Sequence, residues 1–356
     1  MKNIVMCLDG TNNQLRAADN TNVVRLLNML DLSDPSRQVA YYDPGVGTFS
    51  SPSAWSPPAR VLSRYAGLMF GAGLRQNLGE AYSYITSTYE SGDHIFVFGF
   101  SRGAYTARAL TGLLEVFGIF RRGSETLIPY AVSAYAKQQR HDDPTFFEGL
   151  RVYAETHSVN RFGHAPVHFV GIWDTVKSAG TLTRQLRWPY TRQLPHATTI
   201  RHAVAIDERR RPFAPYLVEY PKPNHLNAVK NQDLLEVWFA GVHSDVGGVF
   251  AAGTRLSDIP LKWMADEAVL RGLLVRPRAY AQMSALSGVD PTGDHHVMPR
   301  YWDLLGPGRR TVPATALIHA SVRERVAKDP AYGARLPDVP HYVCDDWRRP
   351  RPYPPP

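Results

Sequence analysis

The segment HIFVFGFSRGAYTARALTGLLEVF, residues 94–117, decides the fold of this 356-residue chain. Its first part, His94 to Phe98, is a short apolar run of the kind that forms a buried strand. Its last part, Ala104 to Phe117, has the length and pattern of a helix. Between them lies Gly99-Phe100-Ser101-Arg102-Gly103, which matches the pattern G-x-S-x-G. A buried strand that turns sharply into a helix is typical of an α/β fold.

Apolar runs and helical patterns alternate in the sequence on both sides of this segment. Short apolar runs predict further buried strands at residues 4–8, 39–42, 167–173 and 235–242. Helical patterns cover residues 21–32, 78–89 and 258–274. Buried strands that are separated by helices form parallel sheets with helices on both faces. We therefore predict an α/β fold with a mainly parallel sheet that helices cover on both sides.

The composition is that of a globular protein. Apolar residues make up 44% of the chain and charged residues 20%, which excludes disorder, collagen and coiled coil as descriptions of the whole. The chain has 40 Lys and Arg against 32 Asp and Glu, so its formal net charge is +8. This charge favours anionic partners without choosing among nucleic acid, a membrane surface and small anions. With only two cysteines, neither a disulfide framework nor a cysteine-based zinc site is expected.

The N-terminus bears on where the chain works. Only five apolar residues follow Met1-Lys2-Asn3 before Asp9, which is too few for the core of a signal peptide. No stretch approaches the ~20 apolar residues that a membrane span needs. We expect a chain made in the cytoplasm without a signal peptide or a transmembrane segment.

Ser101 is the candidate nucleophile, because G-x-S-x-G between a strand and a helix is the pattern of a nucleophile elbow. A serine hydroxyl needs a base, and the base needs an orienting acid. In the chain order Ser, Asp, His, the candidates are Asp174 and His243, which each follow an apolar strand. Asp245 is an alternative acid. The N–H of Arg102, at the start of the helix, is expected to face a developing oxyanion.

The end of the first predicted strand, Asp9-Gly10-Thr11, has three interpretations. A phosphotransferase motif D-x-D-G-T would need an aspartate where this chain has Cys7, which argues against an aspartyl phosphatase. A second interpretation is an oxyanion loop, in which Gly10 or Thr11 offers a backbone N–H toward Ser101. The third is a plain strand-to-helix turn. Asp9 is also expected to bind substrate. No metal site is predicted, and Asp9 and Asp245 are the candidate ligands if a metal ion assists.

A basic and aromatic segment follows Asp174. Between residues 177 and 196 it contains Lys177, Arg184, Arg187, Arg192, Trp188 and Tyr190 and no acidic residue. Such a combination favours an anionic membrane surface. Alternatively, the segment is a solvated loop whose arginines pair with carboxylates elsewhere. We expect Lys177, Trp188 and Tyr105 to bind substrate, and we expect no nucleic-acid partner, since Arg209-Arg210-Arg211 stands in no nucleic-acid module.

Seven motifs occur in a fixed order, and together they resemble one family. They are LDGTNN at 8–13, TNVVRL at 21–26, YYDPGVGT at 41–48, GFSRGAYTAR at 99–108, GIWDTV at 171–176, AIDERRRPF at 205–213 and GVHSDVGG at 241–248. The chain resembles the α/β-hydrolase family called domain of unknown function 2235, which includes type VI secretion phospholipase effectors of the first class. The resemblance implies that Ser101 is the nucleophile, His243 the base and Asp174 the acid.

The resemblance covers residues 1–275, which we assign to an α/β-hydrolase catalytic domain. Residues 121–165 and 177–200 are predicted insertions near the site. Residues 276–349 are predicted to form a C-terminal extension that packs on the domain, and 350–356 a proline-rich tail.

These patterns lead to one main functional hypothesis. The chain is predicted to be a serine hydrolase that cleaves carboxylic esters through a Ser-His-Asp triad and an acyl-enzyme, as a lipase or phospholipase without a cofactor. The implied partners are a phospholipid or other ester, an anionic membrane surface, and an immunity protein or secretion apparatus that would deliver it to a target cell. The alternatives are a carboxylesterase of a small substrate and a non-catalytic binding scaffold on the hydrolase fold.

Overall fold

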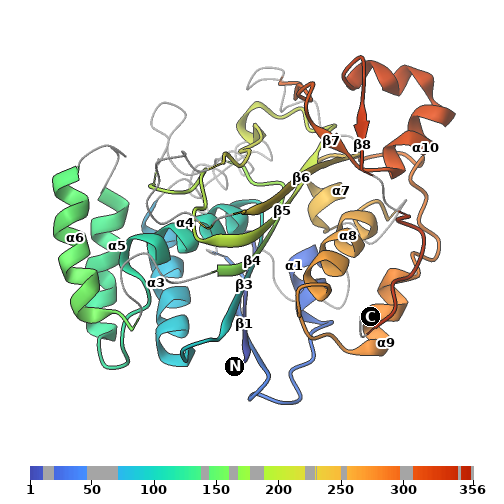
Figure 1. The fold of residues 1–356 in the computed structure, drawn as a ribbon. Helices are drawn as coiled ribbons and strands as arrows, with labels where there is room; N and C mark the ends of the chain where they lie inside the picture. The colour runs from blue at the N-terminus through green and yellow to red at the C-terminus, as the bar shows by residue number, and fades with distance from the viewer. Residues whose placement is uncertain are drawn as a thin grey trace, which may run out of the picture.

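The computed structural model places one parallel sheet at the centre of the molecule, with strand order β2-β1-β3-β4-β5-β6-β7-β8 (Figure 1). The structure describes residues 1–10, 20–45, 71–137, 144–159, 167–176, 188–220, 229, 231–249, 255–296, 308–343 and 346–353. The strands are β1 Asn3–Leu8, β2 Gln38–Asp43, β3 His94–Phe100, β4 Val167–Trp173, β5 Ala197–Ala205, β6 Asp233–Phe239, β7 Leu317–Ile318 and β8 His341–Tyr342.

The order of the strands determines where a ligand can bind. After β1 the chain forms β2 on one side of it, and then returns to form β3 on the other side. The direction of the crossovers therefore reverses between β1 and β3. Open α/β sheets bind ligands outside the carboxyl ends of the strands at such a switch point. The segments that follow β1 and β3, at Asp9 and Ser101, meet at this point.

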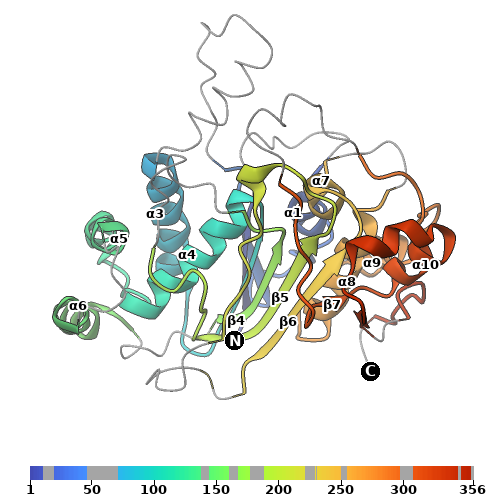
Figure 2. The same cartoon turned by 90° about the horizontal axis from the view of Figure 1, so that it is seen from above.

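Helices cover both faces of the sheet (Figure 2). One face carries α3 Gly71–Thr88 and α4 Arg102–Phe117, and α5 Ile128–Lys137 and α6 Pro144–His157 pack on the outside of these two helices. The other carries α1 Asn22–Leu27, α8 Asp258–Val269 and α9 Pro277–Ser284. Two further helices, α7 His243–Gly247 and α10 Ser321–Lys328, lie toward the end of the chain. The predicted fold, a mainly parallel sheet with helices on both faces, is confirmed.

The sequence of β1 shows why both faces are covered. Ile4, Met6 and Leu8 belong to the core cluster beneath α3, α4 and α5, whereas Val5 and Cys7 belong to the cluster beneath α1, α8 and α9. Successive side chains of a strand point to opposite faces, so an uninterrupted apolar run needs a partner layer on each side. Cys7 is a free cysteine with a buried side chain.

The structure also contains a central strand that the sequence analysis missed. β5 has the sequence ATTIRHAVA, and its first residues fall within the predicted insertion 177–200. Arg201 and His202 interrupt the apolar pattern of this strand, yet both are buried. Each is paired: Arg201 donates to Glu267 at 2.6 Å, and His202 lies 2.7 Å from Glu236. Paired charges thus replace the apolar side chains from which a buried strand is normally recognised.

The C-terminal part of the chain extends the same sheet. β7 pairs with β6, with Trp238 opposite Ile318, and β8 pairs with β7. Trp347 packs in the core cluster beneath α8, and the Tyr353 hydroxyl accepts a hydrogen bond from the Val275 N–H at 3.2 Å. β7 and β8 therefore extend the sheet, and Trp347 and Tyr353 contact the side of the molecule that carries α8.

A substitution at Gly103 tests how closely α4 packs against the end of β1. Gly103, at the start of α4, crosses the end of β1 so closely that a Cβ there would lie 2.1 Å from the Leu8 carbonyl oxygen. Because backbone cannot move aside cheaply, Gly103→Ala is expected to lower the free energy of unfolding by about 3 kcal/mol. Urea unfolding measures this. Gly149→Ala is the control, since a Cβ at that helical position meets nothing within 4 Å. Equal stability of the two variants would contradict the prediction.

Candidate active site

Ser101 lies on the sharp turn between β3 and α4. Its backbone has φ 58° and ψ −117°, a conformation that non-glycine residues rarely adopt. The turn requires close backbone approach, because a Cβ on Gly99 would lie 2.6 Å from the Gly103 carbonyl oxygen. The N–H of Ser101 donates to the Trp173 carbonyl at 3.1 Å, which ties the turn to the end of β4. Strain of this kind, held by surrounding structure, is typical of functional sites.

His243 is the first residue of α7 and follows the end of β6. Its Nε2 lies 2.8 Å from Ser101 Oγ, and its Nδ1 lies 2.6 Å from Asp174 Oδ2. The rings of Phe100 and Phe213 contact the imidazole, with centroids 4.6 and 5.0 Å away. The structure thus brings the three residues selected by chain order into one hydrogen-bonded row. The imidazole ring is also held by aromatic side chains.

Asp174 is fully buried at the end of β4, with φ 38°. Its own N–H donates to the Ala203 carbonyl at 2.7 Å, and its Oδ1 accepts the Ala205 N–H at 2.9 Å. Arg310 donates from Nη1 to Oδ1 at 2.6 Å and from Nη2 to Oδ2 at 3.0 Å. Burial raises the pKa of this carboxyl, but the charge of Arg310 and the His243 hydrogen bond outweigh burial and hold the pKa well below its usual range.

The electrostatics of His243 favour the neutral imidazole. Burial lowers the pKa of His243, while the hydrogen bond and the charge of Asp174 raise it and Arg210 lowers it further. The net effect is a pKa below the ordinary histidine value. A neutral imidazole whose Nδ1 proton points at Asp174 leaves Nε2 free to accept the proton of Ser101.

The predicted oxyanion donors have different surroundings. Arg102 begins α4, so its N–H belongs to the first turn of that helix, as expected. The Gly10 N–H instead donates to the Asp9 carboxylate at 2.7 Å, which does not favour Gly10 as an oxyanion donor. Thr11 lies outside the described residues.

Asp9, a predicted substrate contact, is bonded to other residues of the fold. Asp9 is buried and accepts hydrogen bonds from Thr21 Oγ1 at 2.5 Å and the Tyr42 hydroxyl at 3.2 Å. Its carboxylate therefore ties the end of β1 to the N-cap of α1 and to β2. No group of three or more potential metal ligands occurs among the residues that the structure describes.

Two other predicted substrate contacts have side chains that are packed in the interior, which does not favour contact with a substrate. Tyr105 and Trp188 are each 1% exposed, and their rings lie 6.1 Å apart. The Tyr105 hydroxyl accepts the Trp188 N–H at 3.4 Å, which secures the loop before β5 to α4. Trp188 is consequently not an interfacial side chain. Lys177 lies outside the described residues.

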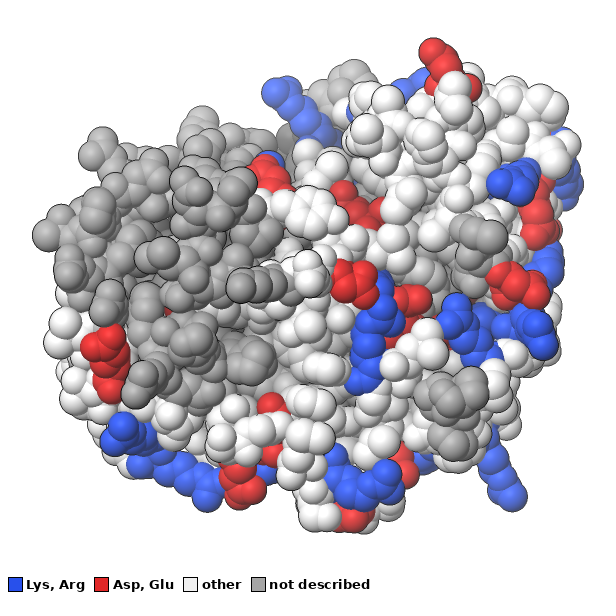
Figure 3. Space-filling view, viewed as in Figure 1, with Lys and Arg blue, Asp and Glu red and all other residues white. Residues whose placement is uncertain are grey.

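The described part of the predicted membrane-binding segment shows paired rather than free charge. Arg192 forms an ion pair with Glu219. Figure 3 shows acidic and basic side chains interspersed on the face it presents, with no broad surface of one sign among the described residues. For Arg192 alone, this agrees with the alternative of a solvated loop whose arginines pair with carboxylates. Arg184 and Arg187 lie outside the described residues.

Asp245, the alternative orienting acid, has a different partner. Its Oδ1 lies 2.5 Å from His296 Nδ1, and its Oδ2 accepts the N–H of Val242 at 3.0 Å. It therefore holds the loop before α7 rather than the Nδ1 of His243, which is bonded to Asp174.

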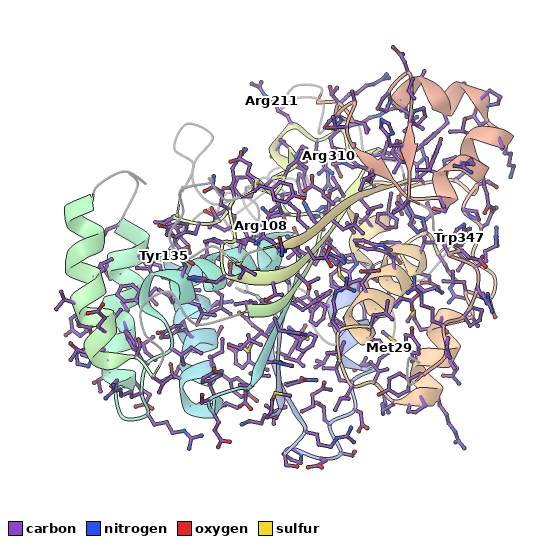
Figure 4. All side chains as sticks on the ribbon, viewed as in Figure 1. Met29, Arg108, Tyr135, Arg211, Arg310 and Trp347 are labelled. Carbon is purple, nitrogen blue, oxygen red and sulfur yellow. The ribbon has the colours of Figure 1, made fainter. Side chains whose placement is uncertain are left out.

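Sequence reasoning missed three charged residues around the site. Glu208 and Arg210 form a buried ion pair at 2.7 Å, and the N–H of His243 points at Glu208 Oε2 at 3.3 Å. Their signal was present, because both belong to the motif AIDERRRPF. Arg310 gave no signal, since it lies in a glycine- and arginine-containing stretch far from every motif. Figure 4 shows Arg310 near the upper edge of the sheet, where the strands end.

Comparison with known proteins shows the family to which the chain belongs. The family model described as "T6SS, Phospholipase effector Tle1-like, catalytic domain" matches residues 2–267, which contain Ser101, Asp174 and His243. The chain belongs to this family. Membership agrees with the resemblance that the ordered motifs indicated, and it supports a lipase or phospholipase function for the chain.

One curated relative and two solved structures are similar to parts of the chain. An uncharacterized protein of Saccharomyces cerevisiae is 33% identical over 218 residues, which are 60% of this chain and 32% of that protein. The chain therefore spans about a third of the length of this curated relative. Two solved structures are each 18% identical to the chain. An uncharacterized protein from Pseudomonas aeruginosa matches 95% of this chain and 51% of its own, with TM-score 0.45. The structure of the Tle1 effector bound to the VgrG spike matches 71% of this chain and 52% of its own chain, with TM-score 0.32.

The helices also bear on membrane insertion. Among the described residues, no helix combines the length and the apolar character that crossing a bilayer requires.

Proposed function

We propose that this chain is a serine phospholipase that hydrolyses carboxylic esters of membrane lipids through an acyl-enzyme. The observation that carries the proposal is the row Ser101 Oγ, His243 Nε2 and Nδ1, Asp174 Oδ2, with distances of 2.8 and 2.6 Å. A serine next to a base that an acid orients is the arrangement that nucleophilic acyl transfer needs. The phospholipid substrate is inferred from the family.

In the proposed reaction, Ser101 Oγ attacks the ester carbonyl carbon while His243 Nε2 takes the hydroxyl proton. The tetrahedral oxyanion accepts a hydrogen bond from the N–H of Arg102, favoured by the positive end of the α4 dipole. The C–O bond to the alcohol then breaks, and His243 returns the proton to that oxygen. Water attacks the acyl-enzyme in the same way, which releases the fatty acid and restores Ser101. Asp174 orients the imidazole and stabilises its charge throughout.

We also propose that delivery follows the family description, with the secretion apparatus as a partner and a target cell as the destination. The Tle1 structure was solved with a VgrG spike, which names one class of such apparatus for that protein. An immunity protein and an anionic membrane surface remain predictions from the sequence.

Vesicle hydrolysis tests the function directly. The full chain is incubated with phosphatidylethanolamine and phosphatidylglycerol vesicles, and the products are identified by mass spectrometry. The proposal expects free fatty acid and lysophospholipid, and their absence in the Ser101→Ala variant. Release of diacylglycerol or phosphatidic acid would contradict ester cleavage at the acyl chain. Turnover of short soluble esters alone would favour the carboxylesterase, and no turnover with Ser101 unlabelled by a fluorophosphonate would favour the scaffold.

The pH dependence of kcat/KM is a further prediction. His243 must be neutral to accept a proton, so activity is lost as the pH falls through its pKa. Because burial holds that pKa below the ordinary value, the acid limb should lie below pH ~6.5. A pH series with a soluble p-nitrophenyl ester measures it. An acid limb above that value would show that Asp174 raises the histidine pKa more than burial lowers it.

A further inference from the structure

Arg310 has a buried side chain that contacts the carboxylate of Asp174. Its side chain is only 2% exposed, and Asp174 beneath it is fully buried. Nη1 donates to Asp174 Oδ1 at 2.6 Å and to the Ala205 carbonyl at 2.8 Å. Nη2 donates to Asp174 Oδ2 at 3.0 Å and to the Phe213 carbonyl at 2.5 Å. Both oxygens of the carboxylate that orients His243 are thus bound by one guanidinium.

The contacts of Arg310 reach His243 from two sides. Asp174 Oδ2, which accepts from Arg310, also lies 2.6 Å from His243 Nδ1. Phe213, whose carbonyl accepts the other Nη2 hydrogen bond, packs its ring edge-on against the imidazole. A planar guanidinium with fixed donors is suited to hold two such groups at once. Arg310 therefore fixes both the acid and the aromatic neighbour of His243.

We infer that Arg310 is a positioning residue for the reaction, which locks the orientation of Asp174 and offsets its negative charge so that His243 stays a neutral base. The inference rests on the proposed function, and it goes beyond the family match because Arg310 lies outside residues 2–267. It assigns a role at the active site to the C-terminal part of the chain.

The charge of Arg310 affects the pKa of His243 in one direction. Asp174 alone stabilises the imidazolium of His243 and so raises the pKa of that histidine. A cation bound to the same carboxylate opposes this effect. The other charged groups facing His243 are Glu208 and Arg210, which neutralise each other in a buried ion pair. Phe100 and Phe213 complete the surroundings without charge. Loss of the Arg310 charge is therefore expected to raise the pKa of His243.

The test separates charge from geometry with two variants of the full chain. Arg310→Met removes the charge and retains much of the volume, so its acid limb should move to higher pH by about one unit. Arg310→Lys retains the charge but cannot form the two parallel hydrogen bonds, so its plateau rate should fall while its acid limb stays in place. Arg309→Met is the matched control, because Arg309 is the exposed neighbour. It should keep the wild-type profile.

The readout is the rate of Ser101 labelling by a fluorophosphonate as a function of pH, which needs no knowledge of the natural substrate. A purely structural role would lower the melting temperature and the plateau of both variants without moving the acid limb. If the wild type is labelled normally and the acid limb of folded Arg310→Met does not move, the role of Arg310 is overturned and the proposed function is not. An unlabelled wild type would overturn the proposed function, and the inference with it.

Folding of the variants is checked by circular dichroism. If Arg310→Met does not fold, Arg310→Gln, which also removes the charge but keeps hydrogen-bond donors, takes its place. An acid limb at higher pH than in the wild type supports the inference, and an unmoved limb in folded Arg310→Gln overturns the offsetting role of Arg310.

Discussion

Ser101→Ala is expected to lower kcat by about 10⁶-fold, the loss seen when the nucleophile of a serine protease triad is removed. The reason is geometric and chemical. Ser101 Oγ is the hydroxyl bonded to His243 Nε2, and the strained backbone at residue 101 directs it above the end of the sheet. Alanine leaves the base and the acid in place but removes the atom that would bond to the acyl group.

Steady-state hydrolysis of vesicles and of a p-nitrophenyl ester measures this loss, and a fluorophosphonate should label the wild type but not the variant. Ser87→Ala, an exposed position in α3, is the matched control and should keep wild-type rates. A folded Ser101→Ala that turned over substrate at the wild-type rate would remove Ser101 from the mechanism.

Asp174→Asn is expected to have the second largest effect, a loss of about 10⁴-fold in kcat, because an amide that donates to Nδ1 would select the wrong imidazole tautomer. In this chain the substitution is also expected to lower the stability of the fold. Arg310 would keep its charge in the interior after losing its carboxylate, and breaking a buried pair in this way costs about 3–5 kcal/mol. The variant should therefore be both slow and less stable.

Two measurements separate these effects. Denaturant unfolding gives the loss of stability, and kcat measured on the folded fraction gives the loss in the chemical step. Asp245→Asn is the comparison, because Asp245 is the other acid near His243 but binds His296. A larger loss of activity in Asp245→Asn than in Asp174→Asn would reassign the orienting acid.

Much of the fold could be predicted because its signals are local. The run at 94–98 and the helix at 104–117 appear as β3 and α4, the latter beginning two residues earlier, at Arg102. The helix predicted at 21–32 is shorter in the structure, Asn22–Leu27, since Thr21 caps its start and the chain turns soon afterwards. β5 was missed because Arg201 and His202 are buried through their partners. Those partners lie in other elements, so no window of sequence reveals them.

Some features of the candidate site could be predicted from the sequence, and others could not. Ser101, Asp174 and His243 were selected from the sequence, because each follows an apolar strand and parallel strands end at one edge of the sheet. The burial of Tyr105 and Trp188 could not be predicted, because the side of a helix or loop that faces the core depends on what packs against it. The hydrogen bonds of Asp9 could not be predicted either, because its partners Thr21 and Tyr42 come from separate elements.

The sequence by itself determined the α/β architecture, the sharp turn at Ser101 and the chain order of the candidate nucleophile, acid and base. These depend on hydrophobic periodicity and on glycines at fixed spacing, which act over a few residues. Only the tertiary structure decided which carboxylate meets His243 and that Arg310, 136 residues beyond Asp174, completes that carboxylate's surroundings. Contacts of this kind form because the C-terminal part of the chain packs back on the sheet edge, and no pattern along the sequence encodes that distance.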